Sequence, residues 1–411
     1  MTPLARLLIG SQFAFNVGFF AVLPYLADHL GGTLGLGGAM VGLVLGLRTF
    51  SQQGLFVVGG ALTDRYGPRP VVLVGCALRV AGFCWLAVAA SAGAVIGAVV
   101  LVGFAAALFS PAVESEIARE ALRVERSGGL RRTRTLARFS AGGQAGALLG
   151  PVIGTLLLYG GGDGAFRTAC LVGAAVFVLV LGAQLWLMPR GGGGGGTPSA
   201  GGGVRAAGSG SVRAAGRLVL GNRRFLLLAL AYASYLLAYN QLYLALPAEL
   251  DRATGSQAAL GWLFALSSVL VVCGSAPLER LAAARLSRTG MVRAGLLLIS
   301  GAFGATAVLR ELPGVAAAVA FTVLLTLGQM LVLPATRALL PDLVDEHRLG
   351  LFTGALSSLS GLAVLTAGAP VGALLDLGGA LPWLVLGAVP LLAVGCVPHG
   401  AERSEAVKVA A

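Results

Sequence analysis

Polar and charged side chains inside long apolar segments are the residues of this sequence that could do chemistry. Arg48 lies near the middle of an apolar stretch at 39–62, with Gln52 one helical turn further along the same face, and Arg79 lies inside the stretch at 70–90. An ionisable side chain costs about 2.5–3.5 kcal/mol at the centre of a bilayer on insertion scales, so each needs a reason to be there. We expect Arg48 to face an internal cavity, the alternative being a structural pair with a carbonyl or an acid. For Arg79, a packing partner or snorkelling explains the residue as well as a function does.

Aromatic and amide side chains extend the list of cavity candidates. Tyr235, Tyr239 and Tyr243 recur every four residues and form a stripe along one predicted helix, a pattern that ordinary packing also produces. A site with aromatic side chains and few charges suits amphipathic, loosely specified ligands. The other cavity candidates are Asn16, Gln144, Asn240 and Gln329.

Proton coupling would require a carboxyl group in a partly dry place, and no acid lies in the middle of an apolar segment. Asp28 and Glu249 lie near the outer ends of the first and seventh apolar segments, at nearly equivalent places. We expect Asp28 to be the better proton-coupling candidate and Glu249 the second. Glu114, near the inner end of the fourth segment, is a further acid with a competing structural role.

The composition indicates that these residues are carried by membrane-spanning helices. Hydrophobic residues make up 57% of the 411-residue chain and charged residues only 11%, whereas soluble domains carry roughly 25%. About 20 apolar residues suffice to cross the hydrocarbon core as a helix. The predicted spans are 4–26, 39–62, 70–90, 93–114, 137–159, 167–188, 225–248, 257–278, 291–309, 314–337, 350–374 and 381–398.

The distribution of basic residues sets the predicted orientation. With the amino terminus in the cytoplasm, 24 of the 29 basic residues fall at or beyond cytoplasmic ends of spans, and the outer loops hold only Arg167, Arg252 and Arg310. This is the positive-inside asymmetry. We therefore expect an all-α multi-pass protein of the cell membrane, with both termini cytoplasmic and the lipid bilayer as its surroundings.

The net charge of +12 and the cysteines add no other function class. The basic residues form no aromatic-interleaved patch, so a nucleic-acid partner is not expected. The five cysteines and three histidines form no ligand cluster, so no metal, disulfide framework or cofactor is expected. We expect a monomer.

The chain divides into two similar halves. A segment at 190–222, with six consecutive glycines and two Val-Arg-Ala-Ala-Gly repeats, predicts a flexible cytoplasmic tether. It separates a six-helix half at 1–189 from a second at 223–398, followed by a cytoplasmic tail at 399–411. Ser110-Pro111-Ala112 and Leu333-Pro334-Ala335 are one of four matched pairs at a spacing near 220 residues. Six spans separate the copies, so the halves have the same orientation and could rock around a central site.

The run GALTDRYGPR at residues 60–69 lies in the predicted cytoplasmic turn between spans 2 and 3. It resembles the G-x-x-x-D-R-x-G-R-[RK] signature of the major facilitator superfamily, with Pro68 in place of an arginine. The resemblance implies a conformational latch made by Gly60, Asp64, Arg65, Gly67 and Arg69. The alternative is an ordinary basic turn.

In this latch, Asp64 would face the start of the eleventh span. Arg65 and Arg69 would pair with an acid at the end of span 4, Glu114 or Glu116.

A second motif, GALLGPVIG at residues 146–154, resembles the antiporter motif of the same superfamily. Gly146, Gly150 and Gly154 would flatten one helix face for close packing, and Pro151 would bend the helix. A generic close-packed helix is the alternative. Together with the run at 46–65, the motif is similar to the drug/proton antiporter branch, notably MdtH-like multidrug exporters. Span 4 lacks the arginine that many proton antiporters carry, so coupling through that residue cannot be carried over.

The resulting expectation is a secondary transporter that works by alternating access, with protons and a small molecule as its partners. Proton-coupled export of drug-like compounds is the first hypothesis, and an uptake symporter of the same fold is the second. A polytopic membrane enzyme or sensor is the third, although no catalytic grouping or nucleotide signature is present.

Overall fold

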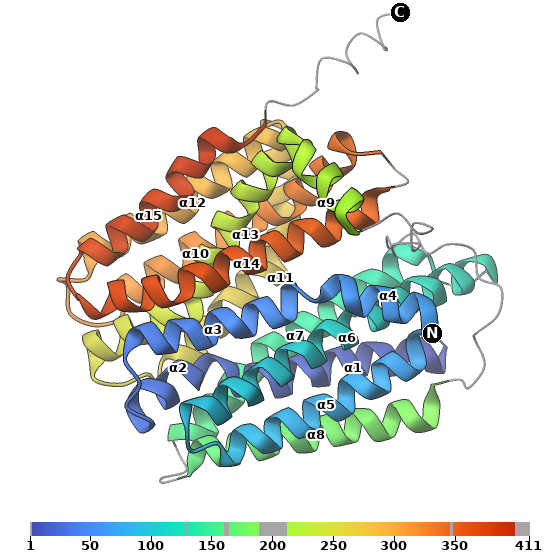
Figure 1. The fold of residues 1–411 in the computed structure, drawn as a ribbon, viewed down its shortest axis with the longest axis horizontal. Helices are drawn as coiled ribbons and strands as arrows, with labels where there is room; N and C mark the ends of the chain where they lie inside the picture. Colours follow the sequence, from blue (N-terminus) through green and yellow to red (C-terminus); the bar gives the residue numbers. More distant parts are fainter. Residues whose placement is uncertain (1, 129, 160–163, 189–211, 346–347, 399–411) are drawn as a thin grey trace, which may run out of the picture.

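The computed structural model describes residues 2–128, 130–159, 164–188, 212–345 and 348–398, and within these ranges the chain is helical and contains no strand. Residue 189, residues 190–211 of the predicted tether, and the predicted tail from 399 onward lie outside the described residues. Figure 1 shows the helices lying side by side in one elongated body.

The first half begins with a long interrupted helix. Helix α1 (Pro3–Phe20) continues through the short turns η1 (Leu23–Tyr25), α2 (Leu26–Asp28) and η2 (His29–Thr33). The second predicted span is divided into α3 (Gly38–Gln53) and α4 (Phe56–Tyr66). The remaining helices of this half are α5 (Pro68–Val88), α6 (Ala92–Arg126), α7 (Arg132–Tyr159) and α8 (Ala165–Leu187).

The second half repeats this order, and its first two helices are not interrupted as those of the first half are. Its elements are α10 (Arg223–Thr254), α11 (Leu260–Ala283), α12 (Arg288–Leu309), α13 (Ala316–Leu343), α14 (Leu349–Asp376) and α15 (Leu381–Ala393), which continues into η4 (Val394–Cys396). Corresponding helices pack in the same way in both halves: α5 against α6 and α8, and α12 against α13 and α15.

Eleven of these helical stretches in the described residues are long and apolar enough to cross a membrane. The segment at 381–398, predicted as a twelfth span, is the shorter apolar helix Leu381–Cys396. The predicted spans otherwise coincide with helices, but several helices are longer. The largest extension is in α6, which continues twelve residues past the predicted end at 114 and ends at Arg126. Within this extension Arg123 forms an ion pair with Glu120 one turn earlier, at 2.6 Å between Nη1 and Oε2.

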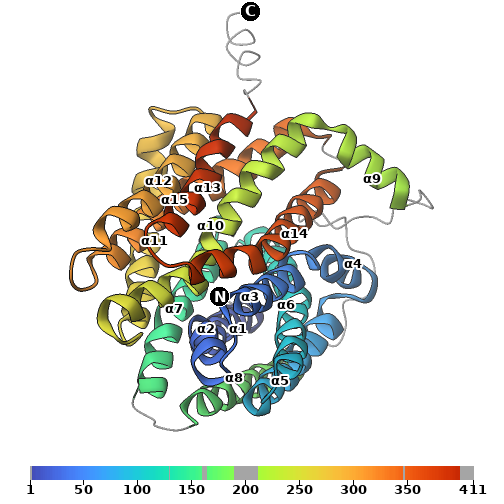
Figure 2. The same cartoon turned by 60° about the vertical axis from the view of Figure 1, so that its left-hand side comes forward.

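The segment Val212–Gly221 differs from the expected flexible tether because it forms helix α9. Leu218 and Val219 of α9 pack against the hydrophobic core, which compensates the ordering of the backbone. Figure 2 shows α9 beside the start of α10.

Two helix pairs make most of the contact between the halves, and glycine makes the closer of them. Helix α3 packs along α14, and α7 packs along α11, as Figures 1 and 2 show for α3 and α14. A Cβ atom at Gly42 would collide with the backbone of Gly368, and one at Gly38 with the backbone of Gly372. Small residues therefore set the distance between the halves at this interface.

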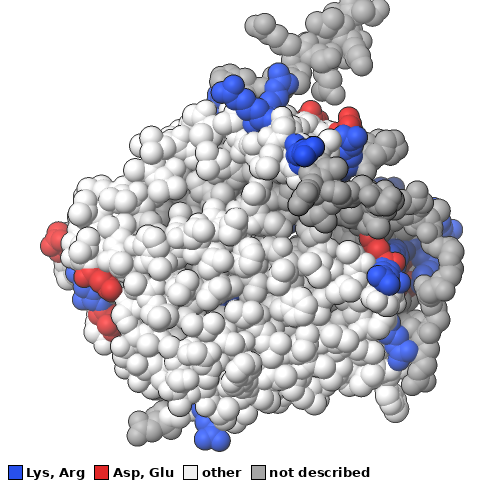
Figure 3. All heavy atoms as spheres, in the orientation of Figure 1, with Lys and Arg blue, Asp and Glu red and all other residues white. Residues whose placement is uncertain are grey.

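Charged side chains lie at the two ends of the helices. In Figure 3 they occupy the left and lower margins and the upper and right margins, with a broad uncharged band between them. Such a band suits a hydrocarbon surrounding. The end that carries the turns at Thr33–Gly38 and Gly255–Leu260 is called the outer end below, following the sidedness predicted from the sequence.

Candidate functional site

Arg48 lies at the contact between the two halves. Its side chain is 7% exposed, and its Nη2 donates a 3.0 Å hydrogen bond to Gln52 Oε1. The guanidinium carbon lies 5.0 Å from the ring centroid of Phe19 and 5.3 Å from that of Tyr243. Phe19 belongs to the first half and Tyr243 to the second, so one cation bridges aromatic rings of both halves.

The tyrosines of α10 form a continuous ladder that ends on Arg48. The ring centroids of Tyr235 and Tyr239 are 6.1 Å apart, as are those of Tyr239 and Tyr243. Tyr232 extends the ladder inward and Phe264 extends it outward, at 5.4 Å each. Tyr235 and Tyr243 are buried at the contact between the halves, and packing and contact with a ligand are both consistent with the stripe.

The predicted amide residues have different surroundings. Asn240 Oδ1 accepts a 3.0 Å hydrogen bond from Thr49 Oγ1 of α3, which links the halves directly beside Arg48. Asn16 donates to the carbonyl of Gly143 at 2.8 Å and so joins α1 to α7 within the first half. Gln144 of α7 and Gln329 of α13 are half-buried, and neither forms a hydrogen bond to another described residue.

Arg79 is enclosed in an aromatic cage inside the first half. Its side chain is fully buried, with the guanidinium carbon 4.3–5.8 Å from four phenylalanine centroids. Nη1 donates to the carbonyl of Val102, whereas Nε and Nη2 have no partner among the described residues. Arg79 therefore has a packing environment rather than a route to a ligand. The four rings belong to Phe15, Phe19, Phe83 and Phe177.

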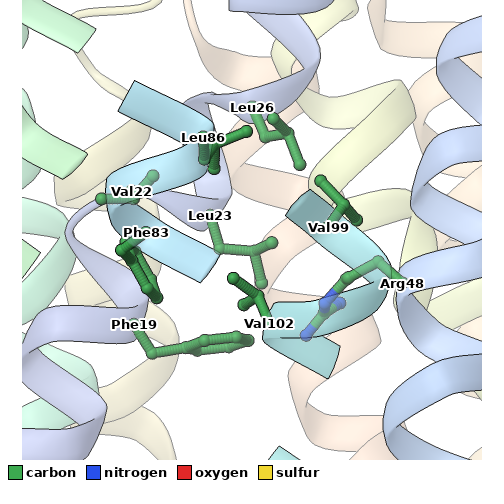
Figure 4. Close-up of a pocket in the computed structure, with 9 residues that line it drawn as sticks. All are labelled: Phe19, Val22, Leu23, Leu26, Arg48, Phe83, Leu86, Val99 and Val102. Atoms are coloured by element: carbon green, nitrogen blue, oxygen red, sulfur yellow. The ribbon is translucent and has the colours of Figure 1, made fainter. Parts of the chain in front are cut away.

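A small cavity of about 20 Å³ lies beside Arg48 and is lined mainly by apolar side chains. Figure 4 shows Arg48 extending from α3 toward Val102 and Phe19 at the edge of this cavity. The volume is about that of one water molecule, so the cavity can loosen the packing around Arg48 but cannot hold a substrate.

The residues of the predicted latch are not joined into one network in this conformation. Asp64 and Arg65 are exposed, and Asp64 interacts electrostatically with Arg119 of α6. Arg69 donates to the carbonyl of Leu185 at 3.1 Å. Within the described ranges, no ion pair links Arg65 or Arg69 to the acids of α6, and Glu116 instead pairs with Arg119 at 3.8 Å.

The two glycines of that turn have separate roles. Gly67 has φ = +84°, a backbone conformation that favours glycine and allows the turn between α4 and α5. A Cβ atom on Gly60 would meet nothing within 4 Å, whereas one on the adjacent Gly59 would collide with the backbone of Ala107. The close helix approach is thus made by Gly59.

Glu114 faces the other half. It is exposed and interacts electrostatically with Arg337 of α13, and Arg337 also interacts with Tyr232 at the inner end of the tyrosine ladder. Glu114 and Arg337 do not form a direct ion pair, so the two charges are separated by more than 4 Å.

The glycine-proline run of α7 packs as its pattern indicates. Gly146, Gly150 and Gly154 lie against the backbone of α1, which allows the two helices to approach closely. The carbonyl of Pro151 accepts a 2.6 Å hydrogen bond from the Tyr25 hydroxyl, and Gly261 of α11 lies against the same turn. This turn therefore touches α1 in its own half and α11 in the other.

The two proton-coupling candidates differ sharply. Glu249 is 3% exposed and is neutralised by Arg252 at 2.6 Å and Arg310 at 3.6 Å. Asp28 forms no ion pair with another described residue; its Oδ1 accepts a 2.9 Å hydrogen bond from Gln257 Nε2 of the second half. Of the two candidates, Asp28 is therefore the one without an ion-pair partner among the described residues.

Comparison with known proteins decides the family. The model of the Major Facilitator Superfamily matches residues 8–248. The multidrug resistance protein MdtH of Yersinia pestis is 31% identical over 383 residues, covering 92% of this chain and 89% of MdtH. The chain belongs to the major facilitator superfamily. It is a multi-pass membrane transporter and not an enzyme.

Other relatives agree with this membership. An uncharacterised MFS-type transporter of Mycobacterium tuberculosis is 35% identical over 383 residues, covering 90% of this chain and 86% of the relative. Among solved structures, a POT family transporter in complex with a thioalcohol-conjugated peptide matches with a TM-score of 0.79 at 13% identity, covering 96% of this chain and 95% of that one. A point mutant of the nucleoside transporter NupG matches with a TM-score of 0.73 at 12% identity, covering 96% and 98%. These likenesses show the superfamily's transporter fold.

Three residues of the interface were not singled out from the sequence. Thr49 carries no signal, because threonine is common in apolar helices. Arg337 could have been found, since it lies three residues after Pro334 as Glu114 lies three residues after Pro111. Phe19 is one phenylalanine among many, and only the fold places it near both buried arginines.

Proposed function

We propose that this superfamily member exports amphipathic small molecules across the cytoplasmic membrane in exchange for protons, by alternating access. The strongest support is the position of Arg48, whose guanidinium contacts the ring of Phe19 in the first half and the ring of Tyr243 in the second. A ligand bound there would contact both halves at once. Rocking of the halves would then change its access from one side to the other.

The chemistry of this interface favours amphipathic ligands. The tyrosines offer apolar rings with hydroxyl groups, Asn240 and Thr49 offer hydrogen bonds, and Arg48 offers one positive charge. Sites of this kind gain affinity from apolar contact and orient the ligand with few polar groups. The multidrug resistance name of the MdtH relative is in line with this substrate class.

For the coupled proton we propose Asp28, with Glu114 as the acid on the inner side. Asp28 accepts its hydrogen bond from the opposite half, so a proton on this carboxyl would alter a contact between halves. Glu114 faces Arg337 of the opposite half in the same way. We further propose that Asp64, Arg65 and Arg69 act as the latch in the conformation that is closed at the inner end. We also propose that the protein is a monomer with twelve membrane spans and both termini in the cytoplasm.

Transport of ethidium into inverted vesicles, with and without an imposed proton gradient, tests this function. Export predicts gradient-dependent accumulation that Asp64→Asn loses. Asp345→Asn removes another exposed acid at the inner end and should leave accumulation unchanged.

A narrow-substrate or uptake carrier would give a different result. Absence of gradient-driven ethidium movement in inverted vesicles would contradict the multidrug proposal. Accumulation of the same dye in right-side-out vesicles would favour an uptake symporter instead.

A further inference from the structure

A second polar region lies at the outer end, away from Arg48. The two halves enclose a cavity of about 390 Å³, lined from the first half by residues between Ala27 and Val41 and from the second by parts of α10, α14 and the turn before α11. Three of the lining residues are aspartates, and none is basic. The aspartates are Asp28, Asp251 and Asp376.

These three carboxylates lack the counter-charges that neutralise Glu249 at the same end. Glu249, two residues before Asp251, is neutralised by Arg252 and Arg310. The guanidinium of Arg252 also donates to the carbonyl of Arg310, so it is turned away from Asp251 toward α12. In the described residues no ion pair involves Asp28, Asp251 or Asp376, and the cavity therefore carries uncompensated negative charge.

Among the polar side chains that line the cavity, the atoms without a hydrogen-bond partner are oxygen acceptors. Asp28 Oδ1 accepts from Gln257 Nε2 at 2.9 Å, and Asp376 Oδ2 accepts from the backbone N–H of Gly38 at 3.0 Å. Gln257 is 7% exposed, and its Oε1 has no partner among the described residues. A buried unsatisfied acceptor is costly, so Gln257 adds a second, neutral indication that a donor belongs in this cavity.

The size and spacing of the groups distinguish among cations. Within the described part of the chain, no three acids lie close enough together to hold a metal ion. The volume instead falls in the range of sites for small organic ligands. We propose that the outer cavity binds an organic cation that carries N–H donors, such as a protonated amine, through Asp28, Asp251, Asp376 and Gln257. This inference rests on the proposed transport function and gives it an external site for cationic substrates.

Occupation of the site would also act on the contact between halves. Asp28 of the first half accepts a hydrogen bond from Gln257 of the second half. Asp376 of the second half accepts one from the backbone N–H of Gly38 of the first half. A cation that competes for these carboxylates weakens both cross-links together. Binding at the outer cavity and opening of the outer end are therefore coupled.

Protection of an introduced thiol tests the site without requiring transport. Ala248 is exposed and lines the cavity, so Ala248→Cys can be labelled from outside by a membrane-impermeant maleimide. The other accessible thiols, Cys84, Cys273 and Cys396, are replaced by alanine in the full-length protein in right-side-out vesicles without a gradient. The probe is 1-naphthylmethylammonium, with neutral 1-naphthylmethanol as its matched control.

The expected result is that the cation slows labelling and the neutral alcohol does not. Asp251→Asn, which loses no side-chain hydrogen bond to another described residue, should raise the half-protecting concentration roughly fivefold, since it removes one charge beside the ligand. Glu311→Gln removes an exposed outer acid that does not line the cavity and should leave that concentration unchanged.

Three outcomes would overturn the site: no protection, equal protection by the neutral alcohol, or equal effects of Asp251→Asn and Glu311→Gln. Each is separable from failure of the transport proposal. Gradient-driven ethidium movement without thiol protection contradicts only the outer site. Protection without ethidium movement supports the site and contradicts multidrug export.

Discussion

Glu114 and Arg337 occupy the same position in the two halves, three residues after Pro111 and Pro334, and carry opposite charges that interact across the interface. The symmetry follows from the fold, because α6 and α13 are equivalent helices of the two halves. Neither residue is buried, so each can exchange this interaction for water or a ligand. The attraction between Glu114 and Arg337 therefore stabilises the conformation in which the inner ends of the halves are close, but does not lock the protein in it.

Reversing one of these charges should impair transport, and reversing both should restore it. Glu114→Arg or Arg337→Glu places like charges across the interface and should reduce gradient-driven transport about tenfold. The double variant restores attraction and should recover most of the rate, as measured by initial rates at matched expression. If the double variant is as slow as the single ones, the two residues act independently.

Arg48 should affect substrate recognition more strongly than stability. Arg48→Lys keeps the charge but loses the planar group that faces Phe19 and Tyr243, so we expect KM to rise several-fold. Gln52→Leu, which removes only the hydrogen-bond acceptor of Arg48, should have a smaller effect. Unchanged KM in Arg48→Lys, measured by dye transport in vesicles, would remove Arg48 from the binding site.

Two substitutions of Arg79 separate the contribution of its side-chain volume to stability from the contribution of its charge. Arg79→Met keeps much of the volume and removes a buried charge without an ion-pair partner in the described residues, so stability should be maintained or increased. Arg79→Ala leaves a cavity among four phenylalanines and should cost about 2–4 kcal/mol. Thermal unfolding of the purified protein followed by tryptophan fluorescence compares them. A loss of stability in Arg79→Met as large as that in Arg79→Ala would mean that the charge itself, and not the side-chain volume, stabilises the fold.

The glycine contact between α3 and α14 should be intolerant of side chains. Gly42→Val would collide with the backbone of Gly368, so the outer ends of the halves could not close and transport should fall at least about tenfold. Gly301→Val in α12 meets open space and serves as the matched control. Normal transport by Gly42→Val would show that this approach is not required in the cycle.

Much of the fold could be predicted because apolar length and basic-residue placement are local signals. Eleven of the twelve predicted spans coincide with helical stretches long enough to cross a membrane, and the last, at 381–398, falls on the shorter apolar helix Leu381–Cys396. The division of span 2 after Gln53 and the extension of α6 could not be predicted, since both depend on neighbours. Gly54 packs against Phe50 and accepts a hydrogen bond from Ser358 of the other half.

The site could be predicted only in part, for a similar reason. Arg48, Gln52 and the tyrosine stripe stand out as polar groups in apolar segments, and the structure brings them together. Asn16 has the same sequence signal but binds Gly143 within its own half. Glu249 looks like Asp28 in sequence, yet Arg310, 61 residues away, helps to neutralise it. Partners distant in sequence decide these cases.

Proton movement driven by substrate tests the central claim most directly. A proton gradient is formed in inverted vesicles, and a pH-sensitive dye reports its dissipation when an amphipathic cation such as ethidium is added. Proton-coupled export predicts prompt, saturable dissipation that requires the protein and is lost in Asp28→Asn. Ethidium accumulation with no accompanying proton movement would contradict the account.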